Sequence, residues 1–360
     1  MRKYLKKYLP SNWIIWIKTS LHSFDIWLLR IFSKSSFSSS LYYAFISNKF
    51  QREHQEMILG KLTYERNLQE NRQPRYLLRR NIHRLEKGLL MRPQKDIFGT
   101  DYIVETVNAY DKIIKFSSLP FNQNEELNWA HDVLVKYFSN VGSQLEIESS
   151  KRKFLEINKS QQLSQECTRV PYKKEDNEKS SVIFDDFLVL TKQRKSVRWF
   201  LDKPVSREAI DKALLAASMS PSGCNRQPYE FRIFDSSEAV QEIASLPGGA
   251  VGFKDNIPAI AVIIGKFEAF FDERDRHLIY IDSSLASMSF ILALETLGLS
   301  SCAINWPDNK DAEKRISNKL ALKPGERVIM LIAFGYADPN RLVAYSQKKN
   351  IDELRRYNFP

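Results

Sequence analysis

The residues best suited to binding a charged ligand form a basic cluster near the middle of the chain. Arg194, Lys195, Ser196 and Arg198 follow one another within five positions. Two guanidinium groups offer fork-shaped pairs of donors, the lysine offers a mobile positive charge and the serine a hydroxyl donor, and all of these can bind phosphate. The cluster therefore predicts a phosphate-binding segment, although a basic run alone is also typical of a solvated surface.

A second polar segment follows a predicted helix. Ser206 is a suitable N-cap for this helix, and Ile210 and Ala217 recur at helical spacing on its inner face. The helix leads into the loop 218–228, which is rich in Ser, Gly, Asn and Pro and leaves backbone groups free to meet a ligand. We predict a strand at 229–234 directly after this loop.

The spacing of the two segments resembles the flavin-binding core of the nitroreductase family. The match is Arg-x-Ser-x-Arg at 194–198, then a helix, then Pro-Ser-x-x-Asn-x-Gln-Pro-aromatic at 221–229. Across residues 181–360 the resemblance implies an α+β fold, with a central, mostly antiparallel sheet flanked by helices and preceded here by a mainly helical N-terminal region. It also implies bound FMN, NADH or NADPH as electron donor, a small-molecule acceptor and a homodimer with active sites at its interface. No catalytic acid or base from the protein is expected.

The resemblance assigns three groups of cofactor-binding residues. The phosphate and ribityl side is assigned to Arg194, Lys195, Ser196 and Arg198, with Lys348 and, as a second choice, Lys349. The backbone amides expected to meet the reactive N5 edge of the flavin are those of Ala303, Ile304 and Asn305. The residues expected from the neighbouring subunit are Pro221, Ser222, Gly223 and Asn225. The family commonly has an arginine in the region of Lys348. The lysine keeps the positive charge but cannot form the two parallel hydrogen bonds that a guanidinium makes with a phosphate.

Three further residues near these segments have two interpretations each. Asp282, at the start of a helix predicted at 280–297, either borders the substrate pocket or caps the helix. Trp306 either fills the substrate site or forms a stacking wall for a planar substrate. Cys302 is a candidate nucleophile, but with no histidine nearby we interpret it as a small buried filler. Further strands are predicted at 257–265 and 328–336.

Composition places the chain among folded proteins long enough for two domains. Its 360 residues are 43% hydrophobic and 12% aromatic, which is sufficient for packed cores. The 54 Lys and Arg residues exceed the 43 Asp and Glu residues, giving a net charge of +11. No nucleic-acid-binding motif accompanies this excess, so no nucleic-acid partner is expected. Cys167, Cys224 and Cys302 lack metal-ligand spacing, which argues against a metal site or a disulfide framework and fits a reducing cytosol.

Residues 1–34 are predicted to form an amphipathic helix after a basic start. The basic residues at the start are Arg2, Lys3, Lys6 and Lys7. Trp13, Trp16 and Trp27 share a face, but charged residues interrupt the run too often for a membrane span of about 18 residues. The helix either lies on an anionic membrane surface, which would make a cytoplasmic protein peripheral at the inner face of the membrane, or packs on its own protein or on a partner subunit.

The rest of the front half is predicted to be helical. The expected regions after 1–34 are a helical extension at 35–140, a polar linker at 141–180 and the FMN-binding domain at 181–360. His83 and Glu86 would share a helix face, either as an acid/base or ligand pair or as a surface hydrogen bond. The string at 83–89 is similar to an N-terminal extension on some nitroreductase-like proteins associated with polysaccharide biosynthesis.

The leading functional hypothesis is therefore an FMN-dependent oxidoreductase that transfers hydride between NAD(P)H and a nitro compound, a quinone or a related acceptor, in an envelope or polysaccharide pathway. The alternative is a membrane-surface accessory protein that binds flavin without nicotinamide-driven turnover. A third hypothesis is flavin-dependent oxidation of a substrate bound partly by the front half.

Overall fold

The structure is a computed structural model that describes residues 10–69, 72–161, 163, 168–176 and 178–358. It contains two compact units, Met1–Ile58 and Leu59–Pro360. Some sequence predictions fall outside the described residues: these are Arg2, Lys3, Lys6, Lys7 and Cys167.

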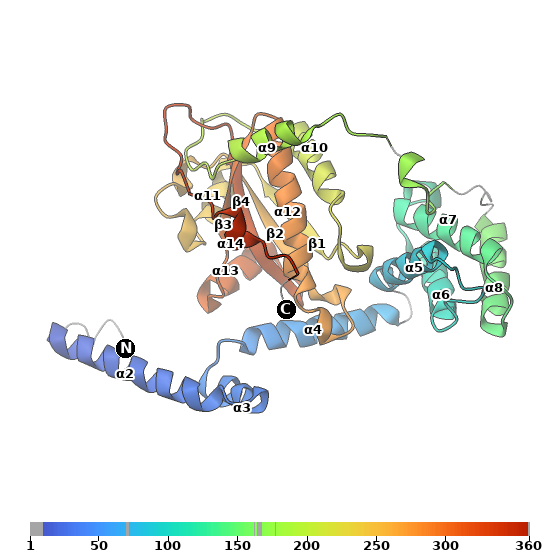
Figure 1. Cartoon of the computed structure of the whole chain (residues 1–360), viewed down its shortest axis with the longest axis horizontal. Helices are drawn as coiled ribbons and strands as arrows, with labels where there is room; N and C mark the ends of the chain where they lie inside the picture. Colours follow the sequence, from blue (N-terminus) through green and yellow to red (C-terminus); the bar gives the residue numbers. More distant parts are fainter. Residues whose placement is uncertain (1–9, 70–71, 162, 164–167, 177, 359–360) are drawn as a thin grey trace. The chain divides into compact units, whose positions relative to one another are not determined.

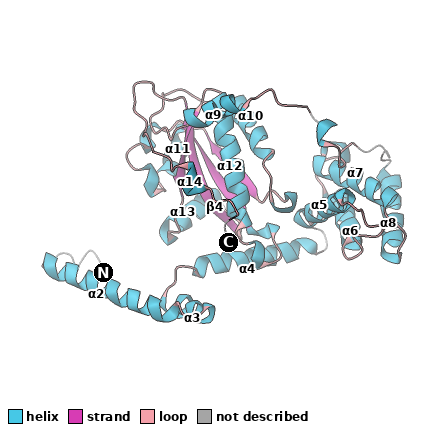
Figure 2. Cartoon of the chain, viewed as in Figure 1, coloured by secondary structure: helices cyan, strands magenta, loops and turns pink. Residues whose placement is uncertain are grey.

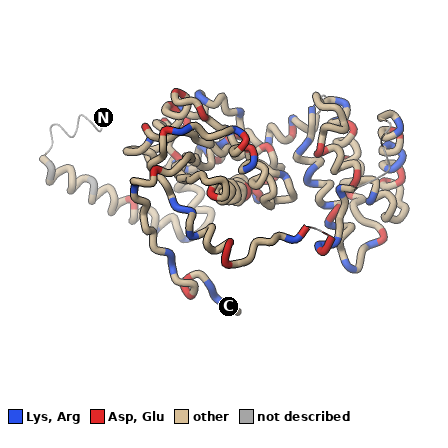
Figure 3. The backbone as a smooth tube through the Cα atoms, turned by 90° about the horizontal axis from the view of Figure 1, so that it is seen from above, with Lys and Arg blue, Asp and Glu red and all other residues tan. Residues whose placement is uncertain are grey.

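The first unit is built from helices. Its elements are α2 (Ser11–Phe32), α3 (Ser36–Leu41), a π-helical turn (Tyr42–Ile46) and the first part of α4 (Gln51–Leu68). The hydroxyl of Tyr42 donates a hydrogen bond to Asp25 Oδ1 at 2.7 Å, which ties the turn to α2. Few charged residues lie along α2, as Figure 3 shows, and the predicted helix is present over most of 1–34.

Four helices in the second unit pack around one apolar core. They are α5 (Arg75–Leu90), α6 (Ile103–Phe116), α7 (Glu125–Asn140) and α8 (Leu145–Gln161). Apolar residues three or four positions apart, such as Leu78, Ile82 and Leu85 on α5, are fully buried against the neighbouring helices. Tyr110 and Tyr137 fill the same core from α6 and α7. The prediction that this part of the chain is mainly helical is confirmed.

The prediction of a polar linker over 141–180 is wrong for its first half. Helix α8 occupies Leu145–Gln161 and buries Ile147, Phe154 and Ile157 in the four-helix core. The three apolar residues lie among many charged ones, but their spacing of seven and three places them on one helix face. An average over the segment hides this pattern, which is why composition alone indicated a linker.

The C-terminal half contains a four-stranded antiparallel sheet in the order β1-β2-β4-β3. The strands are β1 (Tyr229–Phe234), β2 (Ala259–Lys266), β3 (Ser300–Asn305) and β4 (Glu326–Gly335). The helices are α9 (Phe184–Gln193), α10 (Arg207–Ser218), α11 (Ser237–Ala244), α12 (Leu278–Thr296), α13 (Lys310–Leu320) and α14 (Ile351–Leu354). Figure 2 shows the strands gathered into this one sheet.

Helices cover both faces of the sheet. Alternate residues of β2, including Ile260 and Val262, face a core shared with α11 and α13. Helix α12 lies across the opposite face (Figure 1), where the Phe290 ring contacts Phe231 of β1 and Phe334 of β4. The predicted α+β class, with a mainly helical region before the sheet, is confirmed.

One described helical stretch, Glu273–Thr296, is long and apolar enough to cross a membrane by length and composition. This stretch contains α12, whose apolar side chains pack on the sheet, and 44% of its most apolar window is buried inside the protein. The buried residues of this stretch belong to the core, whereas Ile281, Leu285 and Met288 of α12 are exposed.

Candidate functional site

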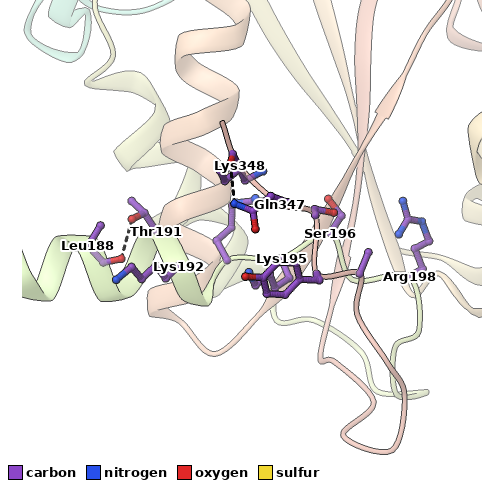
Figure 4. A pocket seen from close by; sticks show the side chains of 12 residues that line it. Leu188, Thr191, Lys192, Lys195, Ser196, Arg198, Gln347 and Lys348 are labelled. Carbon is purple, nitrogen blue, oxygen red and sulfur yellow. Dashed lines mark hydrogen bonds between the residues drawn. The ribbon is translucent and has the colours of Figure 1, made fainter. Parts of the chain in front are cut away.

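A cavity of about 560 Å³ lies where the end of α9 and the following loop meet the C-terminal segment. Its lining consists of Leu188, Thr191, Lys192, Arg194, Lys195, Ser196, Arg198, Ala344, Tyr345, Ser346, Gln347 and Lys348. Figure 4 shows side chains of α9, such as Thr191, on one side, those of the following loop, such as Arg198, on the other, and Gln347 and Lys348 between them. Segments about 150 residues apart in sequence therefore form one site, which we call the basic cavity.

The basic cavity carries positive charge without a neutralising partner in its wall. Five of its lining residues are Lys or Arg, and none is Asp or Glu. Ser196, Ser346 and Thr191 add hydroxyl donors. This set of donors fits the phosphate group of FMN, which carries negative charge and several acceptor oxygens.

The structure brings together five of the residues that the sequence singles out for the phosphate side. They are Arg194, Lys195, Ser196, Arg198 and Lys348. Lys349 is exposed and does not line the basic cavity. Lys192 lines it but was not predicted. Its position in the last turn of α9, two residues before Arg194, is the signal that would have found it.

The basic cluster is attached directly to the outer edge of β3. Ser196 and Ser301 form a parallel bridge, in which the Val197 N–H donates to the Ser301 carbonyl at 3.0 Å. Backbone groups alternate between the two edges of a strand, so Ala303, two residues further along, also turns its N–H and carbonyl to this outer edge. The phosphate-side segment and the predicted N5 segment thus lie next to each other.

The three residues predicted to meet N5 do not face the same way. Ala303 and Asn305 are exposed and share the outer edge of β3, whereas the side chain of Ile304 is buried in the core. Ile304 pairs with Leu331, and the alternation turns its backbone groups toward β4. The prediction of an amide contact to the flavin therefore rests on Ala303 and Asn305.

The loop predicted to come from the neighbouring subunit does not line the basic cavity of its own chain. The residues concerned are Pro221, Ser222, Gly223 and Asn225. The Asn225 carbonyl accepts a hydrogen bond from Arg79 Nε at 2.7 Å, so α5 of the helical region contacts this loop. Cys224 and Asn225 have positive φ angles of 53° and 52°, and these two hold the loop in a tight turn.

Asp282 supports this loop. It does not cap α12, so the interpretation of Asp282 as a helix cap is wrong. The helix begins at Leu278, so Asp282 lies in its second turn. The Asp282 Oδ2 atom accepts a hydrogen bond from the Gly223 N–H at 3.0 Å. Burial raises the pKa of the Asp282 carboxyl, and the Gly223 hydrogen bond partly opposes this.

Trp306 belongs to the core, which contradicts both interpretations of it as part of the substrate site. Its ring is buried in the core shared with α11 and α13, and its Nε1–H donates to Glu313 Oε1 at 2.7 Å. Cys302 is buried in the same core, and this burial raises the pKa of its thiol despite the opposing effect of Arg198 and Arg194. The geometry agrees with Cys302 as a filler, because a buried neutral thiol is a poor nucleophile.

His83 and Glu86 form part of the helical region. His83 Nδ1 lies 3.5 Å from Glu86 Oε2, and Glu86 Oε1 accepts a hydrogen bond from Trp129 Nε1 at 2.9 Å. The carboxylate thus links α5 to α7, which favours the hydrogen-bond interpretation of the pair. Among the described residues, no group of three or more His, Cys, Asp or Glu is arranged to hold a metal ion.

Comparison with known proteins gives consistent matches to the C-terminal half of the chain. A model of the nitroreductase family matches residues 191–251 and 238–336. A protein of Archaeoglobus fulgidus, provisionally named NADH dehydrogenase/NAD(P)H nitroreductase, is 24% identical over 48% of this chain and 98% of its own length. A protein of the same name from Methanothermobacter thermautotrophicus is 34% identical over 32% of this chain and 58% of its own length. The solved structure of an FMN-dependent nitroreductase from Clostridium difficile R20291 is 27% identical and covers 48% of this chain and 99% of that chain, with a TM-score of 0.42.

The matched region contains the basic cluster, the loop after α10 and the four strands, while the C-terminal side of the basic cavity lies just beyond it. The family is FMN-dependent and draws its electrons from NAD(P)H. The similarity of the chain to the nitroreductase family therefore lies in residues 191–336.

Proposed function

We propose that the C-terminal domain is an FMN-dependent oxidoreductase that passes electrons from NADH or NADPH to a small organic acceptor, such as a nitro compound or a quinone. The observation that carries this proposal is the basic cavity, with its five cationic side chains and no carboxylate, set against the outer edge of β3. The flavin supplies the hydride chemistry when it is bound, so the chain has to bind and orient it.

The chain's residues divide this task between them. Arg194, Lys195, Ser196, Arg198 and Lys348 hold the phosphate side. The outward N–H groups of Ala303 and Asn305 donate hydrogen bonds to the flavin ring and fix its orientation. Because these amides belong to a strand paired with β4, they are held in place before the ligand arrives.

The test compares the binding of FMN with that of riboflavin, which lacks the phosphate. We expect Arg198→Gln and Lys348→Gln to weaken FMN binding by about tenfold each, the low end for a charge-assisted hydrogen bond, because both side chains are exposed. Riboflavin binding should change little. Arg315→Gln, at an exposed arginine on α13 away from the basic cavity, is the matched control. Equal losses of affinity for FMN and riboflavin would contradict the assignment of these side chains to the phosphate.

A second measurement separates the oxidoreductase from a protein that only stores flavin. The bound flavin spectrum is followed anaerobically after addition of NADH and then NADPH. Rapid bleaching by either donor supports turnover. A flavin that neither nicotinamide reduces would favour the accessory-protein hypothesis.

We also propose that two copies of the chain complete each site. Members of the nitroreductase family usually act as homodimers. The residues Pro221, Ser222, Gly223 and Asn225 lie outside the basic cavity of their own chain, which supports a role in the partner's site. Mixing Arg198→Gln chains with Asn225→Gly chains tests this. If each site uses Arg198 of one subunit and Asn225 of the other, random pairing of the two chains gives about a quarter of the sites both wild-type residues. If each site uses residues of one subunit alone, no intact site forms.

The location of the protein is a separate proposal. We infer that α2 lies on an anionic membrane surface, so that the protein is cytoplasmic and peripheral at the inner face. Trp13, Trp16 and Trp27 are more than half exposed within their own unit, and Trp is enriched in helices that lie in the membrane interface.

Co-sedimentation with vesicles containing phosphatidylglycerol tests the location. Trp13→Ser combined with Trp16→Ser should abolish pelleting with the vesicles. Leu215→Ser, at an exposed position of the C-terminal domain, should leave it unchanged. No pelleting of the wild-type chain would instead favour packing of α2 on a partner subunit.

A further inference from the structure

A second cavity of about 560 Å³ in the larger unit shares no residue with the basic cavity. We call it the arginine cavity. It is lined by Tyr64, Glu65, Leu68, Leu77, Arg80, Arg84, Glu105, Cys224, Arg226, Phe271 and Arg274. These residues come from α4, α5, α6, the loop after α10 and the segment before α12. The volume is within the range of pockets that bind small molecules.

Positive charge exceeds negative charge in the wall of the arginine cavity. Its four arginines face two glutamates, Glu65 and Glu105. Arg80 is 3.5 Å from Glu105, and so is already paired. Among the described residues, no carboxylate lies within ion-pair distance of Arg84 or Arg274. Arg84 Nη1 donates to Asn81 Oδ1 at 3.3 Å, so the other Arg84 donors and the Arg274 guanidinium are left to meet a negative charge from outside the chain.

Arg226 is the buried arginine in the wall of the arginine cavity. It is only 4% exposed, and burying an arginine is costly unless its donors are satisfied. One side of its guanidinium is held by Asp275 at 2.9 Å and by the Ala269 carbonyl at 3.2 Å. Its Nε is buried without a hydrogen-bond partner and is sealed from the cavity, so Arg226 adds positive charge to the wall and no contact to a ligand is assigned to its Nε.

Aromatic rings orient the arginines. The Arg80 and Arg274 guanidinium carbons lie 4.6 Å and 5.4 Å from the centre of the Phe271 ring. The Arg84 guanidinium carbon lies 3.6 Å from the centre of the Tyr102 ring. An arginine whose flat face contacts a ring keeps its donors free at the edge of the guanidinium plane, where they can bind an oxyanion in fork geometry.

We propose that the arginine cavity binds a small organic oxyanion, with a phosphate or carboxylate group held by Arg84 and Arg274 and a planar apolar body lying against Phe271 and Leu77. This goes beyond the proposed flavin chemistry and does not depend on it. Arg80 and Arg84 belong to α5, outside the region matched by the family model, so the site is a feature added by the helical extension.

The arginine cavity also touches the loop that is proposed to meet the partner's flavin. Cys224 lines it and is central in the turn Gly223–Asn225. A ligand in the arginine cavity therefore contacts the same loop, and α5 already holds that loop through Arg79 and Asn225. The extension is thereby positioned to recognise a charged substrate or effector at this loop.

Isothermal titration of the full chain tests the proposal. The chain is first saturated with FMN so that the basic cavity is filled, and it is then titrated with phenyl phosphate, benzoate or inorganic phosphate at constant ionic strength. We expect phenyl phosphate to bind about tenfold more tightly than inorganic phosphate, because its ring buries apolar surface. Arg84→Gln and Arg274→Gln should each weaken phenyl phosphate about tenfold.

Two controls keep the test decisive. Arg315→Gln should leave the affinity unchanged, and Arg274 is exposed, so its replacement does not endanger the fold. Thermal unfolding of every variant identifies any that fail to fold. If neither phenyl phosphate nor benzoate binds at millimolar concentration, the proposal is wrong. It is also wrong if both bind equally well to wild type, Arg84→Gln and Arg274→Gln.

Discussion

Replacing Trp306 with phenylalanine tests whether this residue belongs to the core or to the wall of the substrate site. In the wild-type chain the indole N–H donates to Glu313 Oε1 at 2.7 Å, and both residues are less than one-tenth exposed. The variant removes this N–H donor from the buried Glu313 carboxylate. A hydrogen bond to a charged group contributes about 1.5–3 kcal/mol, and the smaller ring adds a cavity cost, so the loss of stability should be about 2–4 kcal/mol.

For a domain of this size, such a loss lowers the midpoint of thermal unfolding by roughly 4–16 °C. Circular dichroism measures the midpoint, and visible absorbance measures the bound flavin per chain. We expect a clear fall in the midpoint with unchanged flavin content at low temperature. Trp199→Phe is the control, because Trp199 is 39% exposed and its ring contacts Arg341, so its loss should cost less than about 1 kcal/mol. The reasoning is refuted if Trp306→Phe unfolds at the wild-type temperature but changes the Michaelis constant for the acceptor.

Three further outcomes are expected. Gly265→Ala should destabilise the domain by about 1–3 kcal/mol in urea unfolding, because the added Cβ would lie 2.7 Å from Ile329 Cδ1 and 3.0 Å from Ile279 Cβ. The control Gly248→Ala should be nearly neutral, because no atom lies within 4 Å of the added Cβ. Asp282→Asn should stabilise the fold at pH 7. Burial raises the pKa of this carboxyl in the folded state above its unfolded value, so ionisation of Asp282 opposes folding. The difference in stability between the variant and the wild type should therefore shrink as the pH falls to about 4. A thiol reagent should modify half-buried Cys224 in the native chain but reach buried Cys302 only after unfolding, and a fast native reaction of Cys302 would contradict its placement in the core.

Local sequence was sufficient where one element carries its own signal. Strand β1 follows the loop at the predicted residues, and Ser206 caps α10 by accepting the Ala209 N–H, as its position indicated. The basic cluster was identifiable because four ligand-binding residue types fall within five positions. Lys348 was found only through the resemblance to a family, since nothing local links residues 194 and 348.

The errors arose where a residue's role depends on a distant partner. Trp306 was assigned to the substrate site because its link to Glu313 and its burial among α11 and α13 are not visible in the local sequence. Of the two interpretations of Asp282, the helix cap was wrong, because Asp282 lies in the second turn of α12 and supports Gly223, 59 residues away. The arginine cavity was missed for the same reason, because its arginines come from three separate segments.

The distance in sequence between the two sides of the basic cavity has a consequence for biosynthesis. One side is complete by Arg198, whereas Lys348 is synthesised about 150 residues later, after all four strands. A nascent chain cannot close the basic cavity until Lys348 has left the ribosome. A chain cut between Gly335 and Ala344 would therefore keep all four strands but lose the C-terminal side of the basic cavity.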